Sequence, residues 1–157
     1  MKYTIEKNRH FSLPRTPKFL VRKVEGTFSF TKSVYNLVGD DQYDWNKLSG
    51  ISFNPLQPDQ NAIMIGWRWN KTTEKFEVGP YYNIDGSNVA PDHIFTSFSE
   101  NQKIKFKITY DTVIIGSIQY KVPDNLNTRY WSSFRIQPFF GGNKPAPETL
   151  ILELDVN

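Results

Sequence analysis

The clearest pattern along the chain is a strict alternation of apolar and other positions over residues 62–69. A period of two is typical of a strand with two different faces. The polar stretch 70–75 predicts a tight connection to a second strand that ends near Tyr82, so that the two strands form an antiparallel hairpin. The expected facing pairs are Trp69 with Phe76, Arg68 with Glu77, Trp67 with Val78 and Gly66 with Gly79.

The two faces of this hairpin predict different roles. One face is apolar and needs a second sheet to pack on. The other face carries Arg68 and Glu77 beside a trough in which Gly66 and Gly79 remove side-chain bulk. We consider this trough the first candidate ligand surface, although an ordinary cross-strand ion pair, worth on the order of a few tenths of a kcal/mol, explains Arg68 and Glu77 equally well.

Short alternating segments recur along the rest of the chain. Lys103–Tyr110 places its isoleucines and aromatic residues inward and its lysines outward, where charge discourages edge-to-edge aggregation. A turn at residues 111–112 then leads into a predicted strand at 113–120. Residues 130–140 and 150–156 also alternate. In the second hairpin the expected facing pairs are Ile108 with Ile115 and Lys107 with Gly116.

Composition agrees with an all-β chain. Aromatic residues make up 15% of the 157 residues, and the long Ala, Leu, Glu and Lys runs that build helices are absent. Around ten short strands with frequent turns predict two antiparallel sheets packed as a jelly-roll sandwich. This length fits one domain, which we place at residues 18–157.

Residues 1–17 show no sustained period, and Pro14 and Pro17 favour an extended path, so we expect an N-terminal arm there. Residues 1–23 contain seven Lys or Arg against a single Glu. Such an arm can lie on an acidic protein, neutralise nucleic-acid phosphates or remain solvated. We favour a protein partner over nucleic acid, with Lys7, Arg9 and Arg15 as the partner-binding residues.

Several classes of protein are excluded by what the sequence lacks. The chain contains no cysteine, which rules out disulfide frameworks, thiolate zinc sites and cysteine nucleophiles. It has no apolar run long enough for a signal peptide or a membrane span, so we expect it to be made and kept in the cytoplasm, with no membrane partner.

The sequence gives little support for catalysis. His10 lies in the predicted arm and His93 follows a turn, and neither has a nucleophile elbow nearby. Glu77 faces Arg68, which holds it ionised and unable to act as an acid. Phosphate-binding and dinucleotide-binding motifs are absent as well. We therefore expect no enzyme, no catalytic residues and no cofactor.

An acidic loop leaves one question open. Asp40, Asp41 and Asp44 supply oxygen atoms of the kind that calcium prefers. The loop lacks the glycine and the closing glutamate of an EF-hand. We predict no metal site, and whether this loop binds a cation stays open.

The sequence contains more residues suited to binding than residues suited to catalysis. If their strands are neighbours, six residues share the non-core face of one sheet: Arg68, Glu77, Tyr81, Trp131, Arg135 and Gln137. Aromatic faces with planar polar groups suit a glycan, and Trp, Tyr and Arg are also common anchors of protein interfaces. Alternatively, Trp131 and Tyr81 complete the core beneath a loop.

Four stretches of sequence carry a family resemblance: DWNKLSGISFNP, IMIGWRWN, KFEVGPYYNIDG and QPFFGGNKPAPETLILEL. Together they resemble small single-domain β-sandwich proteins of Bacteroidetes and their bacteriophages. That group is similar in architecture to concanavalin-like jelly rolls, which include lectins and alginate-lyase-like polysaccharide lyases. The lyases use a Gln-Ile-His triplet, whereas Gln137 is followed here by Pro138.

The resemblance implies a non-enzymatic protein. Our first expectation is a structural or accessory protein of a bacteriophage virion, assembled in the host cytoplasm, that docks on capsid or tail proteins or on a second copy of itself. The alternative is a lectin-like module that binds glycans for host-surface attachment. The third hypothesis is a polysaccharide lyase-like enzyme.

Overall fold

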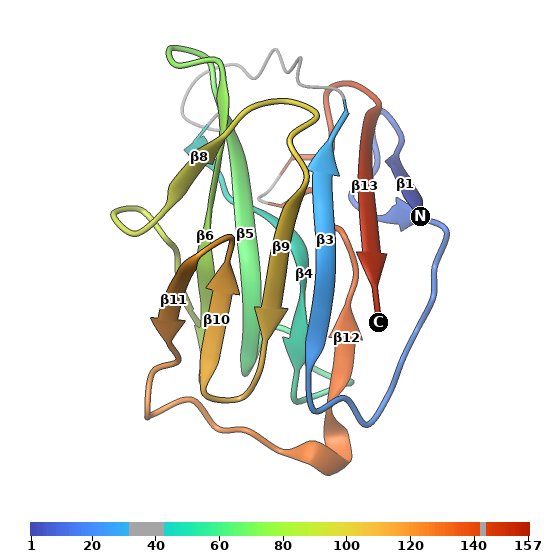
Figure 1. Ribbon diagram of the computed structural model, residues 1–157. Coiled ribbons are helices and arrows are strands. Elements are labelled where there is room, and N and C mark those ends of the chain that lie inside the picture. The colour runs from blue at the N-terminus through green and yellow to red at the C-terminus, as the bar shows by residue number, and fades with distance from the viewer. Residues whose placement is uncertain (32–42, 142–143) are drawn as a thin grey trace.

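The computed structural model describes residues 1–31, 43–141 and 144–157, and its strands form two layers (Figure 1). The seven-stranded sheet contains, in spatial order, β11 (Ile118–Lys121), β10 (Thr112–Ile115), β9 (Ile104–Ile108), β3 (Val24–Phe30), β13 (Leu150–Val156), β1 (Lys2–Ile5) and β2 (Ser12–Leu13). The six-stranded sheet contains β12 (Phe134–Ile136), β4 (Asn46–Ser52), β5 (Ala62–Asn70), β6 (Lys75–Ile84) and β7 (Ser87–Val89) in that order, and β8 (Thr96–Phe98) also pairs with β6.

The predicted all-β fold of two antiparallel sheets packed as a sandwich is confirmed. Every pairing between the named strands is antiparallel. The helical element with defined bounds in the described ranges is a short 3₁₀ turn, η2 (Tyr130–Ser132). None of the helical structure described is long and apolar enough to cross a membrane.

The core lies between the two sheets and is rich in aromatic rings. Phe30 of β3 stacks on Phe76 of β6 with ring centroids 4.1 Å apart, and Trp67 of β5 lies 5.0 Å from Phe30. All three side chains are fully buried. Stacked and tilted ring pairs add about 0.5–1.5 kcal/mol each to the hydrophobic contribution, so this cluster joins the two layers.

The central hairpin has the predicted register. Trp69 lies opposite Phe76, and Gly66 lies opposite Gly79. The odd-numbered residues of β5 from Ile63 to Trp67 enter the core, so the even-numbered ones lie on the outer face of the six-stranded sheet. Alternation fixed the two faces here, because a slip of one residue would turn the whole apolar set toward solvent.

The predicted register of the second hairpin is wrong by two residues. Ile108 lies opposite Val113, and Lys107 lies opposite Ile114. The Thr109 hydroxyl accepts hydrogen bonds from the amides of residues 111 and 112, which closes the turn one residue earlier than expected. A shift of two preserves which side chains face inward, so the pattern of burial did not reveal the error.

Two predicted strands are interrupted. The segment 113–120 contains β10 and β11, because Gly116 adopts a φ of +62° and reverses the chain. The segment 130–140 begins with η2 and contains only β12. Asp40 and Asp41 of the acidic loop lie outside the described residues.

The prediction of an N-terminal arm separate from the sandwich is wrong for its first residues. Strand β1 pairs with β13, and Tyr3 and Ile5 are buried in the core. Residues 11–20, which we call the strap, then run along the edge of the six-stranded sheet. The strap makes isolated β-bridges from Phe11 to Phe139 and from Phe19 to Phe134. The strap thus connects an edge of one sheet to an edge of the other.

Candidate functional site

The glycine trough on the outer face of β5 and β6 is covered. A Cβ atom placed on Gly79 would lie 2.4 Å from the carbonyl oxygen of Ile94 and 2.6 Å from Cβ of Pro91. The segment around residues 91–94 therefore lies directly on the sheet, and glycine is required for this close approach. The predicted open surface is a packing contact.

The Arg68 and Glu77 side chains form a buried network on this face. Arg68 Nε donates to Glu77 Oε2 at 2.6 Å, and Asn70 Nδ2 donates to Glu77 Oε1 at 2.7 Å. Glu77 is only 4% exposed. Both carboxylate oxygens are thus satisfied by the protein itself, which leaves this pair little capacity for a ligand.

Arg68 also fixes two neighbouring segments. Its guanidinium lies 4.4 Å from the Trp45 ring centroid and 5.6 Å from that of Phe95, and Nη1 donates to the carbonyl oxygen of Tyr43. Trp45 Nε1 in turn donates to Asp92 at 2.9 Å. Arg68 therefore joins the segments around residues 43–45 and 92–95 to the sheet.

Tyr81 belongs to a second, small hydrophobic cluster on the same face, with Trp45, Ala62 and Met64. Burial, reinforced by nearby carboxylates, raises the pKa of the Tyr81 phenol. The phenol stays neutral, and its ring supports the side chains above it. The alternative that Tyr81 completes a core is the one that the structure supports.

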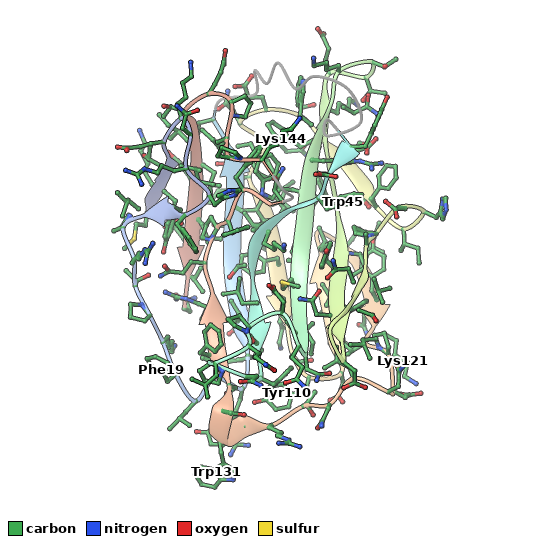
Figure 2. The ribbon with its side chains drawn as sticks, turned by 180° about the vertical axis from the view of Figure 1, so that it is seen from behind. Phe19, Trp45, Tyr110, Lys121, Trp131 and Lys144 are labelled. Carbon is green, nitrogen blue, oxygen red and sulfur yellow. The ribbon has the colours of Figure 1, made fainter. Side chains whose placement is uncertain are left out.

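Trp131 does not join the predicted face. It extends from η2 at the end of the sandwich opposite to Trp45 and is 85% exposed (Figure 2). Arg68 contacts Trp45 and so lies at the other end. The alternation over residues 130–140 predicted a regular strand, in which Trp131 and Arg135 would share one face. The 3₁₀ turn at Tyr130–Ser132 breaks the alternation, so the two side chains do not share a face.

Arg135 and Gln137 hold the strap. Arg135 Nη2 donates to both the carbonyl oxygen and the hydroxyl of Thr16, at 2.6 and 2.7 Å, and Gln137 Nε2 lies 2.9 Å from the same hydroxyl. Tyr3 contacts the Thr16 hydroxyl at 3.2 Å. Two of the predicted ligand-binding side chains therefore have a structural task.

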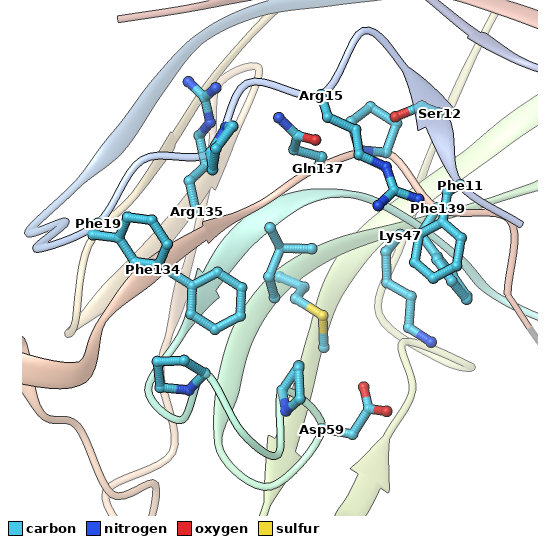
Figure 3. A pocket seen from close by; sticks show the side chains of 16 residues that line it. Phe11, Ser12, Arg15, Phe19, Lys47, Asp59, Phe134, Arg135, Gln137 and Phe139 are labelled. Carbon is cyan, nitrogen blue, oxygen red and sulfur yellow. The ribbon is translucent and has the colours of Figure 1, made fainter.

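A groove of about 630 Å³ lies between the strap, the segment 134–139 and the loop 55–59 (Figure 3). Its base includes Met64, which is buried on the outward face of β5. Three residues predicted to bind a ligand or partner, Arg15, Arg135 and Gln137, line this groove. It is therefore the best candidate site in the part of the chain that the structure describes.

Phenylalanine pairs mark two ends of the groove. Phe11 and Phe139 meet edge to face with centroids 5.1 Å apart, and Phe19 lies 6.4 Å from Phe134. Figure 3 shows the two pairs on opposite sides of the opening. Phe11 is 57% exposed and Phe19 is 62% exposed, so each pair presents apolar surface to solvent.

Lys47 brings a positive charge into the groove. Its ammonium lies 5.3 Å from the Phe139 ring centroid and 5.5 Å from that of Tyr81, both within the range of cation–π attraction. Among the described residues, no carboxylate forms an ion pair with it. Burial lowers the pKa of Lys47, and Asp59 and Asp44 oppose that effect by attraction at longer range.

Arg15, Asp59 and Ser12 complete the polar lining. The Arg15 guanidinium lies over the Phe11 ring at 4.7 Å, and within the described ranges it forms no ion pair. Asp59 accepts a long hydrogen bond from Asn83. Ser12 is 2% exposed, and its hydroxyl has no hydrogen-bond partner in the described structure.

The remaining predicted residues lie elsewhere. Lys7 and Arg9 are exposed, but neither lines the groove. His10 Nδ1 lies 2.9 Å from the carbonyl oxygen of Phe140, and its ring stacks on Phe139, which makes His10 part of the packing. His93 is exposed. No group of three or more potential metal ligands occurs among the residues described.

Sequence reasoning missed Lys47, Asp59 and all four groove phenylalanines as site residues. In the sequence, Lys47 belongs to the stretch DWNKLSGISFNP that carries the family resemblance, and no pattern there marks it as a site residue. One signal was present, because Phe11 and Phe19 are apolar residues in a segment without the alternation that would bury them. Exposed aromatic residues that gather around one concavity form the kind of apolar patch that is typical of interaction sites.

Comparison with protein-family models, with curated proteins and with solved structures finds no match to this chain. The fold and the groove define it as an all-β sandwich with an apolar, positively charged groove on one sheet.

Proposed function

We propose that this chain is a non-enzymatic docking protein that binds a segment of a partner protein in the groove between the strap and the loop 55–59. The observation that carries the proposal is the pair of phenylalanines Phe11 and Phe19, which are more than half exposed at opposite ends of one groove. Exposed aromatic side chains around a concavity are typical anchors of protein interfaces.

The polar groups of the groove favour a peptide over a glycan. A sugar ring needs several converging hydrogen-bonding groups beside its aromatic contact. Arg135 and Gln137 already bind Thr16, and the lining is otherwise dominated by phenylalanine, proline, methionine and isoleucine. The separation of Trp131 from Arg68 also removes the surface on which the glycan alternative was based.

The cellular setting of this role comes from the sequence resemblance. We propose that the partner is a capsid or tail protein and that the chain is an accessory component of a bacteriophage virion.

Site-specific crosslinking tests the proposal. A photo-crosslinking amino acid replaces Phe19 in one variant and Ile118 in another; Ile118 is also exposed, but it lies on β11 at an edge of the other sheet. Gradient-purified phage particles that contain each variant are irradiated and their proteins separated. We expect a defined crosslinked product from the Phe19 position and none from the Ile118 position.

Two results would overturn the proposal. Absence of the chain from purified particles would refute the proposed role in the virion. Equal crosslinking from both positions, or none from either while the chain is present in the particles, would end the assignment of docking to the groove.

A further inference from the structure

We propose that the groove recognises an acidic peptide segment in which a carboxylate lies next to an apolar side chain, with the carboxylate held by Lys47 and Arg15. This inference rests on the proposed docking function and adds the chemistry of the partner.

The charges that line the groove are unequal. Three cationic side chains, those of Arg15, Lys47 and Arg135, face one carboxylate, that of Asp59. Arg135 binds a neutral hydroxyl and a carbonyl oxygen, so its charge is not cancelled. A ligand with a negative group therefore complements this groove, whereas a basic ligand would be repelled.

Lys47 is the strongest anchor for that negative group. An ammonium between two ring faces has lost much of its water, and in the described structure no carboxylate forms an ion pair with it. A ligand carboxylate would restore a charge-assisted hydrogen bond that the protein does not provide. The lowered pKa of Lys47 reflects the same loss of solvation.

The phenylalanine pairs add two apolar subsites. One pair, Phe11 with Phe139, lies beside Lys47, whose ammonium is 5.3 Å from the Phe139 ring centroid. The other pair, Phe19 with Phe134, lies across the groove (Figure 3). A matching segment carries one apolar residue adjacent to its acidic residue and a second apolar residue further along.

Methyl NMR provides a selective readout because the chain contains only two methionines, Met1 and Met64. Met64 lines the groove, whereas Met1 lies at the chain terminus beside Asp155. The protein is labelled with ¹³C at the methionine methyl groups. It is titrated with a blocked peptide that carries two phenylalanines and one aspartate, and separately with the same peptide carrying asparagine.

We expect the aspartate peptide to shift the Met64 signal and leave the Met1 signal in place. The asparagine peptide should bind at least about tenfold more weakly, which is the effect of one charge-assisted hydrogen bond in a partly buried site. Lys47→Leu should reduce the difference between the two peptides to what Arg15 alone supports, and Lys47→Arg should retain it. Asp59→Asn should strengthen binding of the aspartate peptide, since it removes a competing carboxylate.

The outcomes separate this inference from the docking function. Equal binding of both peptides at Met64 would overturn the acidic preference and leave docking in place. A Met64 shift with neutral oligosaccharides and with neither peptide would overturn both and favour the glycan alternative. Thermal unfolding of each variant identifies any loss of binding that comes from misfolding.

Discussion

The buried ion pair between Arg68 and Glu77 makes a quantitative prediction that differs from its behaviour as a surface pair. Glu77 is 4% exposed in the native chain, and replacing Arg68 by Met removes one of the two donors to its carboxylate described above. The Asn70 amide is the donor that remains. Removing one partner of a buried pair costs about 3–5 kcal/mol, because an uncompensated charge remains. We expect Arg68→Met to lower the free energy of unfolding by that amount.

Replacing Glu77 instead of Arg68 should cost less stability. In Glu77→Gln, Arg68 keeps its contacts with the Trp45 ring and, at 3.8 Å, with Asp92. We expect a loss of about 1–3 kcal/mol. The double variant carries neither charge, so its cost should fall short of the sum of the two single costs by about 2 kcal/mol.

Urea unfolding followed by tryptophan fluorescence measures all four proteins. The unfolding midpoints of the native protein, the two single variants and the double variant give the coupling energy of the pair only if the four denaturant slopes agree, which is checked for each variant. A cost below 1 kcal/mol for Arg68→Met, with additive effects in the double variant, would refute this reasoning. The pair would then behave like an exposed cross-strand contact, and the closure of the segments around residues 43–45 and 92–95 would need another explanation.

Three further predictions concern the fold. Ile5→Ala should lower the free energy of unfolding by about 2–5 kcal/mol, because Ile5 is buried in the core. Lys2→Ala, at an exposed position on the same strand, serves as the control. Small and equal effects of the two substitutions in urea unfolding would contradict the placement of β1. Burial, with a smaller effect of the neighbouring tyrosine, raises the pKa of Tyr82 to about 12 from 10.0, so its ionisation favours the unfolded chain. About 2 kcal/mol of stability should therefore be lost as the pH rises from 10 to 12. Tyr82→Phe should lose less stability over that range, and identical pH profiles for the two proteins would exclude this cause. Gly79→Ala should lower the thermal midpoint, since its Cβ would meet the Ile94 carbonyl oxygen at 2.4 Å, while an unchanged midpoint would show that the covering segment yields.

Local pattern predicted the central hairpin because two independent constraints agreed there. The alternation over residues 62–69 fixed the faces, and the polar turn fixed the register. In the second hairpin the turn was decided by one hydroxyl, that of Thr109, which moved the closing pair by one position on each strand. Alternation is blind to a shift of two residues.

The groove was beyond local pattern because its parts come from distant segments. The strap reaches residues 134–139 through two isolated bridges, and Lys47 reaches Phe139 through another. No periodicity along the chain predicts which strand edges meet. The basic character of Arg15 was recognised, but its position over Phe11 depends on the path of the strap.

The placement of β13 between β1 and β3 has a consequence for how the chain reaches its native state. Leu152 faces both Tyr3 and Phe30, so the centre of the seven-stranded sheet cannot close until segments from opposite ends of the described chain have met. Bringing such distant segments together lowers the conformational entropy of the chain before their stabilising contacts form. We therefore expect slow folding, roughly milliseconds to seconds, with the β3 edge open to wrong partners until β13 arrives.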